Sequence, residues 1–508
     1  MLRTLPLIIL VLILSFGCKT PELTNPKSWV GMDEPDTPFI DQFRNPAPEP
    51  CEADPETGPA TVAAKAPDVE EGAPAPTIAI PEKALAGQRL TIGVARNEAI
   101  EAYLNSVLEK LQRAWPGEPV PSYVFLRPSP EFGSFAADHA VFVDYGLLRT
   151  LESEDEVAAL LAHEYSHVLL GHQSLQSWSS LLGVAVDLYQ TTASVKYRTS
   201  GDQDNLLKDA ALSIAADKLG QNALIPVFSR DNEEDADSLG TDLLILSGYS
   251  PMGMVNLLQR VADWEDRQEQ LKEEIRKAEE EARKAAKDGK DELSMDKLFA
   301  DLGKATNKIG RKHYAAKDRE SAVKQYVRTH YAGRPRNALL TEPYQAVFGS
   351  GKVAQYFNGL DDMDNAKLAA ISGKPKDALA LIRGKRCRTL IQDVPYVRYL
   401  DRDIAARNKK LKLKTLEADC QRDDTLLLEY RLLMIQYEAK APKEALAVAD
   451  TAYASLDKPE LLLPDLIRLN KKLGNESQSL GYLVTCKGSG DSGLISSCQE
   501  NLNTEKEQ

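Results

Sequence analysis

The residues of this chain that can do chemistry gather in one short stretch, "LLAHEYSHVLLGH", at positions 160–172. It holds three of the six histidines of the 508-residue chain. His163 and His167 are four residues apart, so on a helix their imidazoles lie one turn apart on one face and can hold one divalent ion. Glu164 lies one step further round, where its carboxylate reaches a water on that ion. The pattern H-E-x-x-H therefore predicts a hydrolytic zinc centre.

The helix that would carry this motif is predicted from "ESEDEVAALLAHEYSHVLL". Its apolar residues recur at helical spacing, and acidic residues crowd its start, as the helix dipole favours. The alternative is a surface helix with stray histidines. The apolar flanks favour a buried helix instead, and burying unpaired histidines and a glutamate is costly unless a metal ion binds them.

A third ligand is needed. His172 lies about half a turn out of phase with His163, and Gly171 is expected to end the helix, so we predict that His172 is a helix-end residue. Glu233 is the better candidate, because "SRDNEEDADSLG" starts a second apolar-periodic helix. Asp237, one turn further on the same face, would accept a hydrogen bond from a ligand histidine and orient it. The alternative for these acids is a solvated helix start.

These motifs resemble the HtpX/Oma-type gluzincin zinc metallopeptidases, over about 90–260 and 325–345. H-E-x-x-H is followed by S-R-x-x-E-x-x-A-D and "SGYSP". Two departures are Ser134, in the family's Asn-Ala-Phe-Ala strand, and Tyr331, in its Thr-His-Pro element. The resemblance implies a zinc endopeptidase with one Zn²⁺ per chain, bound by His163, His167 and Glu233, in which Glu164 moves the proton.

Two further elements of the domain bear on catalysis. His330 has three open roles: a displaceable fourth ligand that keeps the resting enzyme closed, a catalytic donor to the transition state, or a plain loop residue. The strand Ala140–Tyr145 precedes the metal helix and is expected to pair with an extended substrate, reading its backbone rather than its sequence.

The first residues predict where in the cell the protein is located. An apolar run from Leu5 to Phe16 fits a signal peptide over 1–17 and is short for a membrane span. It ends in "LSFGC", which resembles a bacterial lipobox with lipid on Cys18, although Ser15 stands where leucine is usual. The alternatives are an uncleaved anchor or an ordinary signal peptide. Lys19 favours the outer membrane over the inner membrane.

The segment 18–85 is rich in Pro, Ala and Glu and predicts a disordered tether that reaches up to about 190 Å. A zinc metalloprotease domain is expected over 86–350, with a charged helical hairpin inserted at 264–322 that is either a solvated arm, a docking arm or a lid. The net charge of −14 excludes nucleic acid as a main partner.

The remainder predicts helices. Similar ten-residue stretches begin at positions 373, 407, 440 and 474. A period near 34 is typical of tetratricopeptide repeats, so 351–484 is expected to be a degenerate α-solenoid that binds peptides or proteins, with a generic helical bundle as the alternative and a tail at 485–508. Cys486 and Cys498 are the favoured disulfide, and a Cys387–Cys420 pair is open.

The predicted fold is mainly α with a small β-sheet. Its layout resembles the periplasmic beta-barrel assembly-enhancing proteases. The leading hypothesis is a periplasmic zinc metalloendopeptidase, anchored to the outer membrane as a lipoprotein, that cleaves unfolded or misassembled envelope proteins. Its repeats would contact the outer-membrane assembly machinery. The alternative is a latent or inactive peptidase-fold scaffold or chaperone that acts through the repeats.

Overall fold

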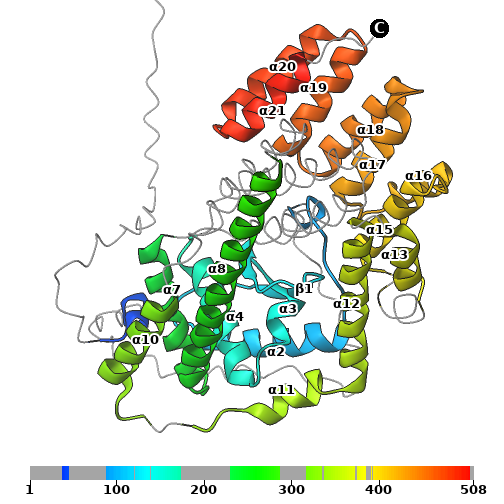
Figure 1. The fold of residues 1–508 in the computed structure, drawn as a ribbon. Helices are drawn as coiled ribbons and strands as arrows, with labels where there is room; N and C mark the ends of the chain where they lie inside the picture. The colour runs from blue at the N-terminus through cyan, green and yellow to red at the C-terminus, as the bar shows by residue number, and fades with distance from the viewer. Residues whose placement is uncertain are drawn as a thin grey trace, which may run out of the picture. The chain divides into compact units, whose positions relative to one another are not determined.

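The computed structural model describes residues 37–44, 87–118, 120–137, 139–172, 229–286, 316–334, 337–371, 374–384, 391 and 393–503. The region around the predicted metal motif is mostly helical with one small sheet, which confirms that part of the predicted fold (Figure 1). Its elements are α2 (Glu98–Ala114), β1 (Tyr123–Arg127), β2 (Ser134–Ala137), β3 (Ala140–Asp144), α3 (Tyr145–Leu148), α4 (Glu154–Leu169), α7 (Arg230–Leu246), α8 (Met252–Ala286), α10 (Ala316–Tyr331) and α11 (Thr341–Phe348).

The sheet has three strands in the order β1-β3-β2, with β1 parallel and β2 antiparallel to β3. Every residue of β3 is buried, and Val141 and Val143 pack in the same core as α2 and α4. Because β3 is paired on both sides, the prediction that the strand Ala140–Tyr145 pairs with substrate is wrong; its last residue, Tyr145, starts α3. Within the described residues, β2 pairs on one side only and leaves the other edge for an extended chain.

Helix α4 is fixed at both ends by local contacts. Ser153 caps its start by accepting a hydrogen bond from the Glu156 amide at 3.2 Å. The acids of the first turn are buried rather than solvated: Asp155 accepts from the Ser250 amide at 2.7 Å. At the other end Gly171 takes a left-handed φ of 63°, and the His172 amide donates to the His167 carbonyl at 3.1 Å. The helix therefore ends directly after the motif, as predicted.

Helix α7 packs directly on α4 at the level of the first histidine. A Cβ added at Gly240 would lie 3.1 Å from the His163 amide nitrogen, tighter than ordinary van der Waals contact. Glycine at this position therefore lets the two backbones approach each other. Ser229 caps α7 by accepting from the Asn232 amide at 3.2 Å, and Leu239 and Leu243 are fully buried in the core.

The predicted inserted hairpin is continuous with the domain that carries it. Helix α8 runs without a break from Met252 through position 264, and α10 is already helical from Ala316, so both predicted boundaries fall inside helices. The two helices lie side by side, and the amide of Ala316 donates to the Glu265 carboxylate at 3.1 Å. The expected turn and most of the return arm lie in 287–315, outside the described residues.

Part of the predicted tether is folded. Residues Phe39–Phe43 form a short 3₁₀ helix, η1, whose Ile40 is only 1% exposed. The Ile40 amide donates to Asp242 of α7 at 2.8 Å, and the Phe39 amide donates to the Tyr326 hydroxyl of α10 at 2.7 Å. The prediction of a disordered tether over the whole of 18–85 is thus wrong at 37–44, because apolar side chains in that stretch are buried against the protease domain.

The C-terminal half is entirely helical where the structure describes it. Its elements are α12 (Gly351–Ile371), α13 (Pro375–Ile382), α15 (Pro395–Arg407), α16 (Leu413–Asp419), α17 (Leu427–Glu438), α18 (Pro442–Ser455), η2 (Glu460–Leu462), α19 (Leu463–Lys472), α20 (Glu476–Gly488) and α21 (Ser492–Asn503). Figure 1 shows α17 to α21 in orange and red as neighbouring helices. Two of the four predicted repeat starts, at 440 and 474, fall in turns shortly before α18 and α20. The start at 407 is the last residue of α15, six residues before α16, and the start at 373 lies outside the described residues.

Residues 485–503 of the predicted tail are folded. Cys486 of α20 and Cys498 of α21 form the predicted disulfide, and both are fully buried. Helix α21 packs on α19, so 485–503 continue the helical array. Cys420 is buried and carries a free thiol. Cys387, its predicted partner, and Cys51 lie outside the described residues.

Candidate metal centre

Three side chains from two helices converge on one point. His163 and His167 of α4 and Glu233 of α7 each offer one ligand atom, and these atoms all lie within 4.8 Å of one another. The His163 Nε2 atom is 3.6 Å from Glu233 Oε2, and the His167 Nε2 atom is 3.8 Å from Glu233 Oε1. All three residues are buried. Two imidazole nitrogens and one carboxylate are the donors of many catalytic zinc sites, so the residues fit the predicted ion.

Both imidazoles are oriented through their other nitrogen. His163 Nδ1 lies 2.9 Å from Asp237 Oδ1, as predicted for an orienting acceptor. His167 Nδ1 lies 3.0 Å from His172 Nδ1, a contact that the sequence did not indicate. With Nδ1 engaged, the Nε2 atoms of the two rings, 3.2 Å apart, face the ligand position.

A buried arginine that the sequence analysis missed joins the acidic groups of the centre. Arg319 of α10 is 4% exposed. Its Nη1 atom lies 2.6 Å from Glu233 Oε2, and its Nε and Nη2 atoms each donate to Asp237 at 2.7 Å. One guanidinium thus fixes both carboxylates relative to each other. No motif indicated it, because Arg319 lies in a charged segment that reads as solvated.

Burial and charge set the protonation of these groups. Burial opposes a charge on His163, but the hydrogen bond and negative charge of Asp237 outweigh it and raise the pKa of His163. Burial raises the pKa of Asp237, but Arg319 and His163 outweigh it, and the net pKa is lowered. Burial, with the neighbouring His163, lowers the pKa of His167 well below its usual value, which keeps this ring neutral as a metal ligand must be.

Glu164 follows the ligand His163 on α4, and its carboxylate contacts the sheet. It is 5% exposed, and its Oε1 atom accepts a hydrogen bond of 2.6 Å from the Ser134 hydroxyl. Ser134 is the first residue of β2, the strand with the open edge. Ser134, which departs from the family's Asn-Ala-Phe-Ala strand, therefore contacts the predicted base directly, and it links that base to the edge where a substrate strand would lie.

The structure does not bring His330 to this centre. Its ring packs on Tyr326 with centroids 4.6 Å apart, near the level of Asp242 on α7. His330 follows Arg319 by eleven residues on one helix, which corresponds to roughly 16 Å along its axis. Its ring thus contacts Tyr326 rather than the predicted ligands, and its three open roles stay predictions. Cys18, the predicted lipidation site, lies outside the described residues.

A helix-borne H-E-x-x-H pair joined by a glutamate from a second helix defines the gluzincin class of metallopeptidases. Comparison with known families agrees: residues 95–336 match the model of Peptidase family M48. The chain therefore carries a metalloendopeptidase domain of family M48.

Curated relatives carry the same kind of name. The chain is 28% identical over 169 residues to a beta-barrel assembly-enhancing protease of Yersinia pestis, which covers 32% of each protein. It is 26% identical over 178 residues to metalloprotease LoiP of Escherichia coli strain K12, covering 35% of this chain and 65% of the relative. Metalloprotease YcaL of the same strain is 29% identical over 147 residues, 29% of this chain and 52% of the relative.

These matches leave most of the chain without a counterpart. The chain spans about a third of the length of the assembly-enhancing protease and about two thirds of LoiP. Among the described residues, no helix combines the length and apolar character that crossing a membrane requires.

Proposed function

We propose that this protein is a zinc metalloendopeptidase that hydrolyses peptide bonds in unfolded or misassembled proteins of the bacterial envelope. The convergence of His163, His167 and Glu233 beside the carboxylate of Glu164 carries the proposal. The names of the curated relatives support the envelope as its site of action and proteins as its substrates.

Each residue of the centre has a separate role in the proposed reaction. His163, His167 and Glu233 hold the ion, which when bound supplies Lewis acidity to water and to the scissile carbonyl. Glu164 accepts the proton of the attacking water and passes it to the leaving amine. Asp237 and His172 keep the two imidazoles in place, and Arg319 fixes Asp237 and Glu233.

The open edge of β2 is the place for substrate. An extended chain that pairs with β2 uses backbone hydrogen bonds, which are independent of sequence. The contact from Ser134 to Glu164 places this edge directly beside the base. Recognition of backbone in an extended conformation suits a peptidase whose substrates are unfolded.

The proposed anchor limits the distance between the membrane and the protease domain. Thr37, the first residue that the structure describes, follows Cys18 by only 19 residues. Fully extended, that length of chain spans at most about 65–70 Å. Lipid on Cys18 would thus hold the protease domain much closer to the outer membrane than a tether running to position 85. The α12–α21 helices are proposed to form the predicted solenoid and to contact the outer-membrane assembly machinery.

The test is proteolysis by the purified chain. We expect cleavage of casein that a chelator abolishes and zinc restores, whereas Glu164→Gln keeps zinc and loses cleavage. A wild-type chain that binds zinc but cleaves neither casein nor denatured envelope proteins would instead favour the scaffold hypothesis. Labelling with a radioactive fatty acid in cells, lost on Cys18→Ser, tests the anchor separately.

A further inference from the structure

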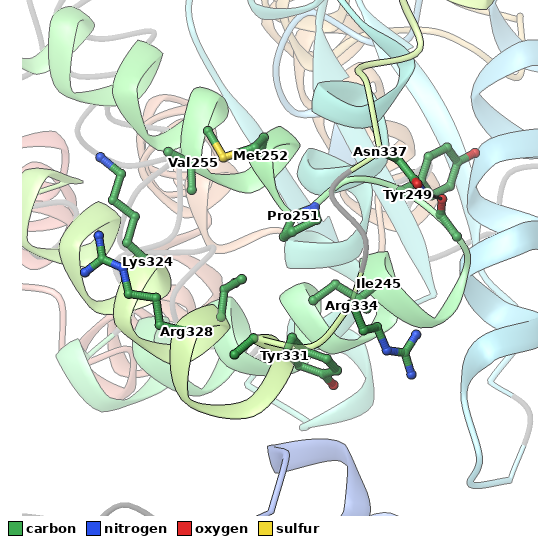
Figure 2. A pocket seen from close by; sticks show the side chains of 13 residues that line it. Ile245, Tyr249, Pro251, Met252, Val255, Lys324, Arg328, Tyr331, Arg334 and Asn337 are labelled. Carbon is green, nitrogen blue, oxygen red and sulfur yellow. Dashed lines mark hydrogen bonds between the residues drawn. The ribbon is translucent and has the colours of Figure 1, made fainter.

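A cavity lies on the protease domain, away from the metal centre. It has a volume of about 400 Å³ and is enclosed by the end of α7, the following loop, the start of α8, and α10 with the residues after it. Figure 2 shows these lining side chains. Most are apolar or aromatic: Ile245, Tyr249, Pro251, Met252, Val255, Val327 and Tyr331. Met252 is 40% exposed at the rim, so an apolar entrance is in contact with solvent.

The two tyrosines present their rings to this cavity. The Tyr331 hydroxyl donates to Asp242 at 2.7 Å, and the Tyr249 hydroxyl donates to Glu154 at 2.9 Å. Neither acid lines the cavity. Each tyrosine hydroxyl is therefore already hydrogen-bonded outside the cavity, and the tyrosines contribute apolar ring surface to the cavity wall.

The charged groups at the cavity are all positive. Lys324 and Arg328 lie on one side and Arg334 on the other (Figure 2), and no acidic residue lines the cavity. Lys324 is paired with Glu320 at 2.6 Å, and the Arg334 guanidinium lies 5.5 Å from the Tyr331 ring centroid. Arg328 forms no ion pair within the described part of the chain. A cationic rim on a chain with a net charge of −14 favours an anionic ligand.

The cavity is separate from the metal centre. Ile245, which lines it, follows the ligand Glu233 by twelve residues on α7, or roughly 18 Å along the helix. An extended polypeptide covers that distance in about six residues. The cavity is thus a site distinct from the residues that would hold the metal.

We propose that this cavity binds the C-terminal end of a polypeptide whose last residue is apolar. The last side chain would fill the space between Val255 and Val327, and its α-carboxylate would pair with Arg328. Only at a chain end do an apolar side chain and a carboxylate belong to the same residue. The inference deepens the proposed function, because it makes the cavity a site that selects protein clients by their exposed ends.

Binding is measured without cleavage, in the full chain carrying Glu164→Gln. A fluorescent decapeptide that ends in phenylalanine with a free carboxylate is titrated by polarisation, beside the same peptide with an amidated end and one that ends in serine. Loss of one charge-assisted contact weakens binding by about tenfold. We expect this tenfold loss of affinity when the peptide is amidated and when Arg328 is replaced in Arg328→Ala. Arg328→Lys should lose less affinity, because lysine keeps the positive charge but not the planar, bidentate geometry of the guanidinium.

Matched variants separate the site from general charge effects. Arg276→Ala removes an exposed arginine of α8 that pairs with Glu273 outside the cavity, and it should leave binding unchanged. Val327→Phe fills the cavity and should weaken binding while thermal unfolding confirms a folded chain. Equal affinity for the free and amidated peptides would overturn the proposal. It would also be overturned if the peptides did not bind and vesicles of anionic lipid bound in a way that depends on Arg328. Casein cleavage by the parent chain is scored separately, so either proposal can fail alone.

Discussion

Replacement of Arg319 by alanine tests the role of the residue that holds the metal centre together. Its guanidinium bonds Glu233 at 2.6 Å and Asp237 twice at 2.7 Å, and all three residues are buried. Without it, the metal-free protein keeps two buried carboxylates that have lost their cation. Removing one partner of a buried ion pair costs about 3–5 kcal/mol. For a domain of this size we expect the unfolding temperature to fall by about 10 °C.

Zinc should deepen that loss in a way that identifies its cause. Asp237 without its arginine orients His163 less firmly, so zinc affinity should fall by about 10- to 100-fold. Because a more weakly bound ion stabilises the folded variant less than it stabilises wild type, the zinc-loaded Arg319→Ala protein should lose more stability than the metal-free one. Arg319→Lys keeps the charge without the two-pronged geometry and should lie between wild type and alanine.

The assay is calorimetric unfolding of chelator-treated and zinc-loaded protein, together with zinc competition against a chromophoric chelator. Arg276→Ala is the control, because its pair with Glu273 is exposed and contributes little. If Arg319→Ala unfolded at the wild-type temperature without metal and bound zinc with wild-type affinity, the role assigned to Arg319 in holding Glu233 and Asp237 would be refuted.

The docked segment and its acceptor give two further predictions. Ile40→Ser should release residues 37–44, because it removes a fully buried side chain; limited trypsin digestion should then cut after Arg44 roughly tenfold faster, and an unchanged rate would argue against docking in solution. The second prediction concerns Asp242, which accepts the hydrogen bond from the Ile40 amide. Burial raises the pKa of Asp242 to about 6, against the opposing hydrogen bonds of Tyr331, the Ile40 amide and Tyr326. Since its folded pKa lies above the unfolded one, its stabilisation is complete below pH 3.8 and is lost as the pH rises through 6. Wild-type stability should thus fall by up to about 3 kcal/mol over that window relative to Asp242→Asn, and parallel curves for both proteins would contradict this assignment.

The sequence was sufficient for the ligands because their chemistry is local. His163 and His167 share a helix face by periodicity alone, and Glu233 and Asp237 do so on a second helix. Cys486 and Cys498 flank a short turn, so their pairing was also predictable. His163 and His167, like Cys486 and Cys498, lie within about a dozen positions of each other, whereas Glu233 was indicated by its place in the S-R-x-x-E-x-x-A-D motif of the resembling family.

What the sequence could not indicate depends on contacts between distant segments. Arg319 lies 86 residues after Glu233, in a segment whose charges resemble those of a solvated helix. Residues 37–44 carry two phenylalanines and one isoleucine within a Pro-rich composition, and composition averaged over the tether concealed them. The order of strands was also hidden: the strand Ala140–Asp144 is more apolar than Ser134–Ala137, and it is central for that reason.

The most direct test of the central claim is metal content measured on the same samples as casein cleavage, for wild type, Glu164→Gln and Glu233→Ala. We predict one zinc ion per chain in the first two, cleavage only in the first, and no retained zinc in Glu233→Ala. Full zinc occupancy in Glu233→Ala, or casein cleavage by Glu164→Gln at the wild-type rate, would contradict the assignment of these residues to the metal centre.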